Sequence, residues 1–100
     1  MVRWMRSAQI APGKYMEAMQ FAKEISEFSQ KYEGASSVGV FLDSFGEVGV
    51  IRWFVDYENL ASLEKISDQI MADPEWFKKI GEATDLFIEG SSYDVVMRDF

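Results

Sequence analysis

The side chains best suited to chemistry in this chain are its four arginines, Arg3, Arg6, Arg52 and Arg98. All four stand in stretches with strand character, whereas the six lysines stand within helical stretches or at the start of one. A guanidinium fork gives two parallel hydrogen bonds and therefore suits a carboxylate, enolate or phenolate ligand. We expect Arg6, Arg52 and Arg98 to lie on adjacent strands and to converge near a cleft. The alternative is pairing across strands or between subunits with Asp56, Asp94 or Asp99.

Aromatic side chains form the second candidate set: Trp4, Trp53, Trp76, Tyr15, Tyr57 and Tyr93. Such residues line pockets for flat hydrophobic ligands. At helical and strand spacing they are also ordinary core or interface residues. Trp53 is the best pocket candidate because its strand lies beside the expected cleft.

Carboxylates cluster near the ends of the third predicted strand, at Asp43, Glu47, Asp56 and Glu58. A buried one would have a raised pKa and act as a base, but turn and cap positions explain most of them. No pair has acid–base spacing, no loop has an EF-hand pattern, and no glycine-rich phosphate loop is present. The chain contains no Cys and no His, which excludes disulfides, thiolate nucleophiles, histidine bases and the commonest zinc sites. We expect no metal and no cofactor, and we assign no catalytic residue.

Composition indicates a single globular domain over residues 1–100, with 48% hydrophobic and 27% charged residues. The formal charge of −7 opposes binding to a phosphate backbone, so nucleic acid is not an expected partner. No apolar run reaches the roughly 20 residues of a spanning helix, and the first residues lack a signal-peptide pattern. We expect a soluble cytoplasmic protein with no membrane partner.

Hydrophobic periodicity predicts strands and helices in alternation. Residues 3–10 are expected to form a strand, residues 14–33 a helix that Gly34 terminates, and residues 37–43 and 47–57 a hairpin with a turn over 43–46 and a bulge at Gly46. A second helical region begins after Asn59 and restarts at Asp73-Pro74-Glu75, an N-cap followed by proline in the first turn. It continues to Gly90, and residues 93–100 form the last strand.

This order is typical of the ferredoxin-like fold, an α+β arrangement of βαββαβ type. Right-handed crossovers and the hairpin favour a four-stranded antiparallel sheet in spatial order 4-1-3-2 with the helices on one face. We expect the hairpin to place two apolar sets on opposite faces. One set is Val38, Val40, Leu42, Val48, Val50 and Phe54; the other is Phe41, Ile51, Trp53 and Val55. A register change of one residue redistributes these sets but leaves both faces apolar.

An apolar sheet face without helices needs a partner. Four strands of about eight residues present a face of roughly 500 Å² in projection, comparable to the largest apolar patches of soluble monomers. Its burial would contribute on the order of 10 kcal/mol before association entropy is subtracted. We therefore expect a homodimer with the open sheet faces inside.

The chain resembles the dimeric α/β-barrel superfamily and within it the NIPSNAP-like group. The resemblance spans the whole element order and has these local anchors: Arg6, Pro12-Gly13-Lys14 with Glu17, Trp53, and Asp73-Pro74-Glu75-Trp76. It implies two ferredoxin-like subunits that form a barrel between their sheets, with a small-molecule pocket between the sheet and helices of each. Members include cofactor-free monooxygenases, lactone isomerases and haem-binding proteins, so the fold alone fixes no function.

Three functions remain open. The first is a homodimer that binds a small apolar or aromatic molecule, with arginine as the anchor when the ligand is anionic. The second is a cofactor-independent monooxygenase or isomerase, and the third is a non-catalytic structural or regulatory dimer. The candidate ligand-binding residues are Arg6, Arg52, Trp53, Tyr93 and Arg98.

Overall fold

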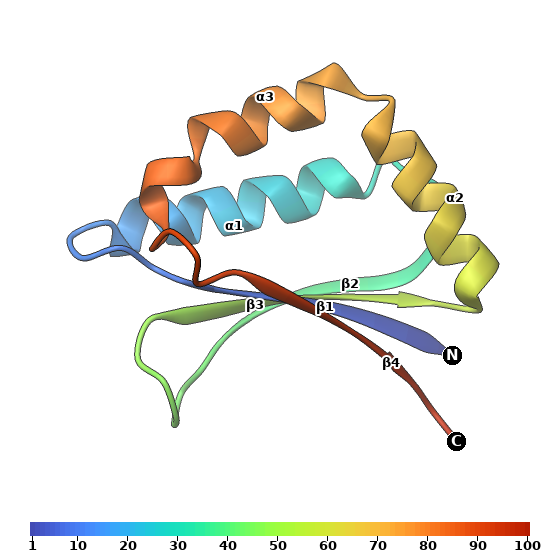
Figure 1. Cartoon of the computed structure of the whole chain (residues 1–100), viewed down its shortest axis with the longest axis horizontal. Helices are drawn as coiled ribbons and strands as arrows, with labels where there is room; N and C mark the ends of the chain where they lie inside the picture. The colour runs from blue at the N-terminus through green and yellow to red at the C-terminus, as the bar shows by residue number, and fades with distance from the viewer.

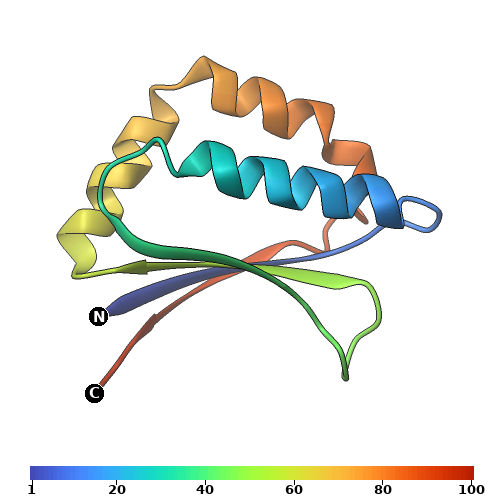
Figure 2. The same cartoon turned by 180° about the vertical axis from the view of Figure 1, so that it is seen from behind.

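Four strands and three helices form two layers in the computed structural model, which describes residues 1–100. The strands are β1 (Val2–Gln9), β2 (Ala35–Leu42), β3 (Val50–Tyr57) and β4 (Tyr93–Arg98). The helices are α1 (Tyr15–Ser29), α2 (Leu60–Met71) and α3 (Pro74–Glu82), followed by a short 3-10 turn at Thr84–Leu86. All three helices lie on one side of the sheet (Figure 1). The opposite side, the open face, carries no helix in either view (Figure 2).

The sheet is fully antiparallel in the order β2-β3-β1-β4. This is the 4-1-3-2 order of the ferredoxin-like fold, so the predicted topology is confirmed. The two predicted helix starts are also confirmed. Asn59 accepts a hydrogen bond from the Ser62 backbone N–H (3.0 Å), and Asp73 accepts one from the Glu75 backbone N–H (3.0 Å). Each side chain therefore satisfies an otherwise free N–H of a first helical turn.

Several element boundaries differ from the prediction, among them the end of α3, which lies at Glu82 rather than Gly90. Helix α1 ends at Ser29, and Gly34 is not its terminator. Gly34 has a φ of 128° and belongs to the turn into β2, where an added Cβ would lie 3.3 Å from the Ser62 carbonyl oxygen. Strand β3 begins at Val50 rather than residue 47, so residues 43–49 form a loop rather than a tight bulged turn.

The longer loop changes which hairpin residues share a face. Val38, Val40 and Leu42 lie opposite Val55, Trp53 and Ile51, so these two groups, predicted on opposite faces, lie together on the helix-facing side. There Val40, Leu42, Ile51 and Trp53 pack in a core with Ala18, Ala22 and Ile25 of α1, whereas Val38 and Val55 pack in a second core with Ile66 of α2. Phe41 and Phe54 lie together on the open face with their rings edge-on, 5.5 Å between centroids.

The open face is less apolar than the sequence predicts. One row across the four strands is apolar, and it consists of Gly39, Phe54, Met5 and Val95. Polar rows flank it on both sides. Ser37, Asp56 and Arg3 form the first polar row, and Arg52, Ser7 and Tyr93 form most of the second. The mixed composition means that a partner on this face must tolerate ion pairs as well as apolar contacts.

Helix α1 is joined to the start of α3 by a polar cluster around Asp73. Its carboxylate accepts hydrogen bonds from Tyr32 Oη (2.5 Å) and Lys31 Nζ (2.6 Å) in addition to the cap. The Lys31 contact, followed by that of Tyr32, lowers the pKa of Asp73 to about 2. These bonds fix the end of α1 against the second helical region.

The lowered pKa of Asp73 predicts an acid-dependent loss of stability. In the unfolded chain this group titrates near 3.9, so between about pH 4 and pH 2 the unfolded state binds more protons than the folded state. The free energy of unfolding therefore falls as the pH drops through this window. We expect Asp73→Asn, which retains the helix cap, to be less stable than the wild type at pH 5 and nearly equal to it at pH 2. Urea unfolding at both pH values measures this difference, and parallel pH profiles for the two proteins would contradict it.

Candidate functional site

Arg6 occupies the centre of a row on the helix-facing side of the sheet. Across the strands this row runs Val40, Trp53, Arg6 and Asp94. The Arg6 guanidinium binds the Asp94 carboxylate through two hydrogen bonds, Nε to Oδ1 (2.7 Å) and Nη2 to Oδ2 (2.9 Å). About 40% of each side chain remains exposed, so the pair is accessible to a ligand.

Trp4 completes the surroundings of this ion pair. The Arg6 guanidinium carbon lies 5.3 Å from the centroid of the Trp4 ring, a cation–π distance. Burial of Asp94 opposes its ionisation, but hydrogen bonds from Arg6 and Trp4 together with the Arg6 charge outweigh burial and lower the pKa of Asp94. Arg6 is therefore held by two hydrogen bonds to a carboxylate whose ionised form its surroundings favour.

Trp53, the neighbour of Arg6 on β3, is 8% exposed, and its indole N–H has no hydrogen-bond partner. Its ring packs edge-on against Phe87, with 5.9 Å between centroids. An unsatisfied buried donor costs about 1–3 kcal/mol, so this N–H is a polar group that a bound acceptor would stabilise.

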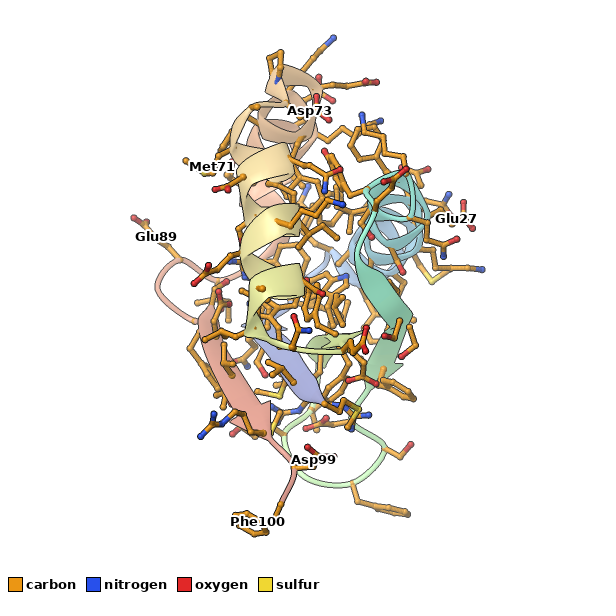
Figure 3. The ribbon with its side chains drawn as sticks, turned by 90° about the vertical axis from the view of Figure 1, so that its right-hand side faces the viewer. Glu27, Met71, Asp73, Glu89, Asp99 and Phe100 are labelled. Atoms are coloured by element: carbon orange, nitrogen blue, oxygen red, sulfur yellow. The ribbon has the colours of Figure 1, made fainter.

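A depression of about 350 Å³ adjoins the ion pair and is lined by Arg6, Ser92, Tyr93 and Asp94. It is accessible because no helix covers β4, whose six residues are all exposed. Figure 3 shows α1 above β2, at the margin of the sheet opposite β4. The depression thus lies at the free margin of the sheet, at the start of β4, with the Arg6–Asp94 pair in its wall.

Arg52 organises a second cluster, on the open face. It donates to both carboxylate oxygens of Asp43 (2.9 and 3.0 Å), to Ser7 Oγ (2.6 Å) and to Tyr93 Oη (3.1 Å). The hydrogen bonds of Ser7 and then Arg52 lower the pKa of Tyr93, and Arg52 lowers that of Asp43. Four of the five N–H groups of Arg52 are already used in these hydrogen bonds. Arg52 therefore serves mainly to connect β1, β3 and β4 to the loop that follows β2.

The structure brings the predicted site residues together in two groups. Arg6 and Trp53 are neighbours on the helix-facing side, whereas Arg52 and Tyr93 are hydrogen-bonded on the open face. Arg98 is on the helix-facing side opposite Val2, two rows from Arg6, and makes no ion pair. Arg6, Arg52 and Arg98 therefore do not converge in one cleft.

The alternative of cross-strand pairing holds for two of the arginines. Arg3 pairs with Asp56 (2.7 Å), and Arg6 pairs with Asp94. Asp99 contacts the Met1 amino group instead (2.9 Å). Among the aromatic candidates, Tyr57 is buried, Trp76 packs with Phe28 and Tyr32, and Tyr15 is exposed.

Sequence reasoning missed Ser7 and Ser92. Ser7 is 1% exposed and bonded to Arg52, and its only signal in the sequence is a small polar residue inside an apolar strand. Ser92 lines the Arg6 depression but stands in a stretch that reads as a turn. No group of three or more His, Cys, Asp or Glu side chains is placed to hold a metal ion, and no helix is long and apolar enough to cross a membrane.

A ferredoxin-like subunit with its helices on one face of a four-stranded antiparallel sheet has the fold of the dimeric α/β-barrel superfamily. Solved structures of that fold cover the whole chain. An uncharacterised NIPSNAP domain protein from Burkholderia xenovorans superposes with a TM-score of 0.81 at 17% identity, over 100% of this chain and 95% of its own. Protein Atu4242 from Agrobacterium tumefaciens gives 0.78 at 18% identity, over 98% and 92%.

The NIPSNAP family model matches residues 4–98, so the chain belongs to the NIPSNAP family. An antibiotic biosynthesis monooxygenase shares the fold at 14% identity, with a TM-score of 0.77 over 100% of this chain and 99% of its own. No curated protein matches the sequence.

Proposed function

We propose that this NIPSNAP protein acts as a homodimer and binds a small aromatic or apolar molecule with an anionic or acceptor group in the cleft beside Arg6. The observation that carries this proposal is the juxtaposition of two groups on neighbouring strands. Arg6 is a half-exposed guanidinium in the wall of a depression, and Trp53 beside it on β3, which does not itself line the depression, holds a buried N–H with no partner.

The donor chemistry defines the ligand class. Two of the five N–H groups of Arg6 go to Asp94, which leaves three for a ligand. A carboxylate, enolate or phenolate is the acceptor that such a fork recognises best. Trp4 beside the guanidinium supplies an aromatic surface for the body of the ligand. The volume of about 350 Å³ lies at the lower end of the range for small-molecule pockets.

The dimer part of the proposal rests on the open face. Phe41 is 59% exposed there, and Val95 and Met97 are each more than a third exposed. Val95 lies in the apolar row with Phe54 and Met5, and Phe41 and Met97 stand at the ends of the two polar rows that flank it. Apolar surface of this extent favours association in water, and the paired charges on either side would set the register of two facing sheets.

Ligand binding is tested by thermal shift with aromatic acids, each matched to its neutral primary amide. We expect the acids to raise the Tm and the amides to raise it less, because only the acids can form the charged fork with Arg6. In the Arg6→Gln/Asp94→Asn double variant, which removes both charges, the acids should lose this advantage. Arg98→Gln removes an unpaired arginine on the same side of the sheet and should leave binding unchanged.

Replacement of Trp53 by Phe provides the sharper test of the same site. In the ligand-free protein, removal of the unsatisfied N–H should stabilise the fold and the loss of packed atoms should destabilise it, so the two effects oppose each other. Affinity for the acid should fall about tenfold, the effect of one lost hydrogen bond. Trp76→Phe, in the aromatic cluster of α3, is the matched control. Equal affinity of Trp53→Phe and wild type in calorimetric titration would exclude the indole as a ligand donor.

The enzyme alternative uses the same cleft. The shared fold with a protein described as an antibiotic biosynthesis monooxygenase supports testing it. Oxygen uptake with electron-rich phenols and no added flavin or metal would favour a cofactor-independent monooxygenase. If no acid binds and no turnover occurs, the non-catalytic dimer is the remaining function.

A further inference from the structure

The loop between β2 and β3, residues 43–49, extends beyond the plane of the sheet on the side away from the helices (Figure 1). The view from behind shows the same projection (Figure 2). Its tip carries Phe45, which is 98% exposed, and Val48, which is 89% exposed. Two large apolar side chains therefore stand in solvent beside the open face, without any contact that would explain them.

The base of this loop is fixed to the sheet. The Asp43 N–H donates to the Val50 carbonyl (3.2 Å), and the Asp43 carboxylate takes both hydrogen bonds of the Arg52 fork. Through Arg52 the loop is also connected to Ser7 on β1 and Tyr93 on β4. Gly46 and Gly49 have φ values of 115° and 76°, which other residues rarely adopt, so they define the path of the loop.

We infer that the 43–49 loop is a dimerisation arm whose Phe45 and Val48 pack against a second copy of the chain seated on the open face. This inference rests on the proposed homodimer. The direction of the loop favours a second copy of the chain as the partner of Phe45 and Val48, because the loop projects on the side where that copy would sit. The Asp43–Arg52 pair would hold the arm at a constant angle to the interface.

The area that a stable dimer needs supports the same assignment. The sheet face offers roughly 500 Å² in projection, whereas a standard interface buries about 800 Å² on each partner. A buried aromatic side chain adds about 150–250 Å². The arm, used once by each subunit, would enlarge the accessible surface buried by the contact of the two sheets.

Site-specific photo-crosslinking tests the arm directly. With p-benzoylphenylalanine at position 45 we expect irradiation to give a covalent dimer on a denaturing gel. Mixing isotope-labelled and unlabelled chains shows whether the linked peptides come from different subunits. The control places the same probe at Met16, which is 74% exposed on α1 in the helical layer, and should give no covalent dimer.

Sedimentation measurements give the strength of the contact. We expect Phe45→Ser/Val48→Ser to weaken the dimer at least about tenfold, as for a central apolar contact, while Met16→Ser leaves it unchanged. A dimer of wild-type strength without crosslinks from position 45 would overturn the arm and leave the open-face dimer intact. A monomeric wild-type protein would overturn the dimer and the arm together.

Discussion

Lysines placed on the open face should convert the protein into a monomer. Phe41 and Val95 lie on β2 and β4, at opposite margins of the sheet, and both are exposed in the single subunit. Phe41→Lys/Val95→Lys should therefore leave the subunit folded but place an unpaired ammonium at each margin of the proposed interface. Burying such a charge costs several kcal/mol, so we expect the dissociation constant to rise at least about a hundredfold. Light scattering coupled to size exclusion measures the mass across a concentration series.

The choice of lysine excludes stronger charge repulsion between subunits as the cause of a weaker dimer. The chain carries a charge of −7, so added lysines reduce the overall repulsion between subunits. Any weakening must then come from the interface itself. Phe77→Lys introduces the same change at a half-exposed aromatic on α3 and should not affect the mass. A double variant that dimerises as well as wild type, with an unchanged circular dichroism spectrum, would show that the open face is not the interface.

Truncation of Ile51 to alanine should cause the largest loss of stability. Ile51 is completely buried on β3, between Ala8 on β1 and the small residues Ala18 and Ala22 on α1. Its neighbours are held by the sheet and the helix and can relax only in part, so a cavity remains. Such truncations cost about 2–5 kcal/mol, a large part of the roughly 5–15 kcal/mol that stabilises a domain.

Urea unfolding compares Ile51→Ala with Ile51→Val, which removes a single methyl group and should cost about 0.5–1.5 kcal/mol. Measurements at several protein concentrations separate the stability of the subunit from that of a dimer. A loss below about 1 kcal/mol for Ile51→Ala would mean that the space is filled by movement of α1 and that Ile51 does not anchor the core.

The helix starts could be predicted from the sequence because their determinants are local. Asn59 and Asp73 each cap the helix that follows, and Pro74 stands where its missing N–H is harmless. The strand order followed from connection rules that do not depend on individual residues. These local and topological signals agree with one another, which is why the fold was predictable.

The faces of the hairpin could not be predicted, because they depend on contacts distant in sequence. Asp43 and Gly46 have the spacing of a tight turn, but the structure uses Asp43 to bind Arg52 and lengthens the loop. A shift of one position exchanges the two faces of a strand, so Phe41 was separated from Phe54, its actual neighbour. The faces of Arg6 and Arg52 likewise depend on the register between strands distant in sequence. The sequence alone therefore did not show that these two arginines lie on opposite faces.

Strand β4 forms one margin of the sheet, and the backbone groups along its outer side are not paired with another strand. Its middle residues, Val95, Val96 and Met97, are apolar and exposed on both faces. An exposed apolar edge strand of this kind can pair with strands of other molecules and promote the formation of fibrils. Asp94 and Arg98 stand immediately on either side of this apolar triplet, as gatekeeper charges do in other proteins. Arg98, which has no ionic partner, therefore leaves an unpaired charge at the end of this margin, where it opposes the addition of further strands.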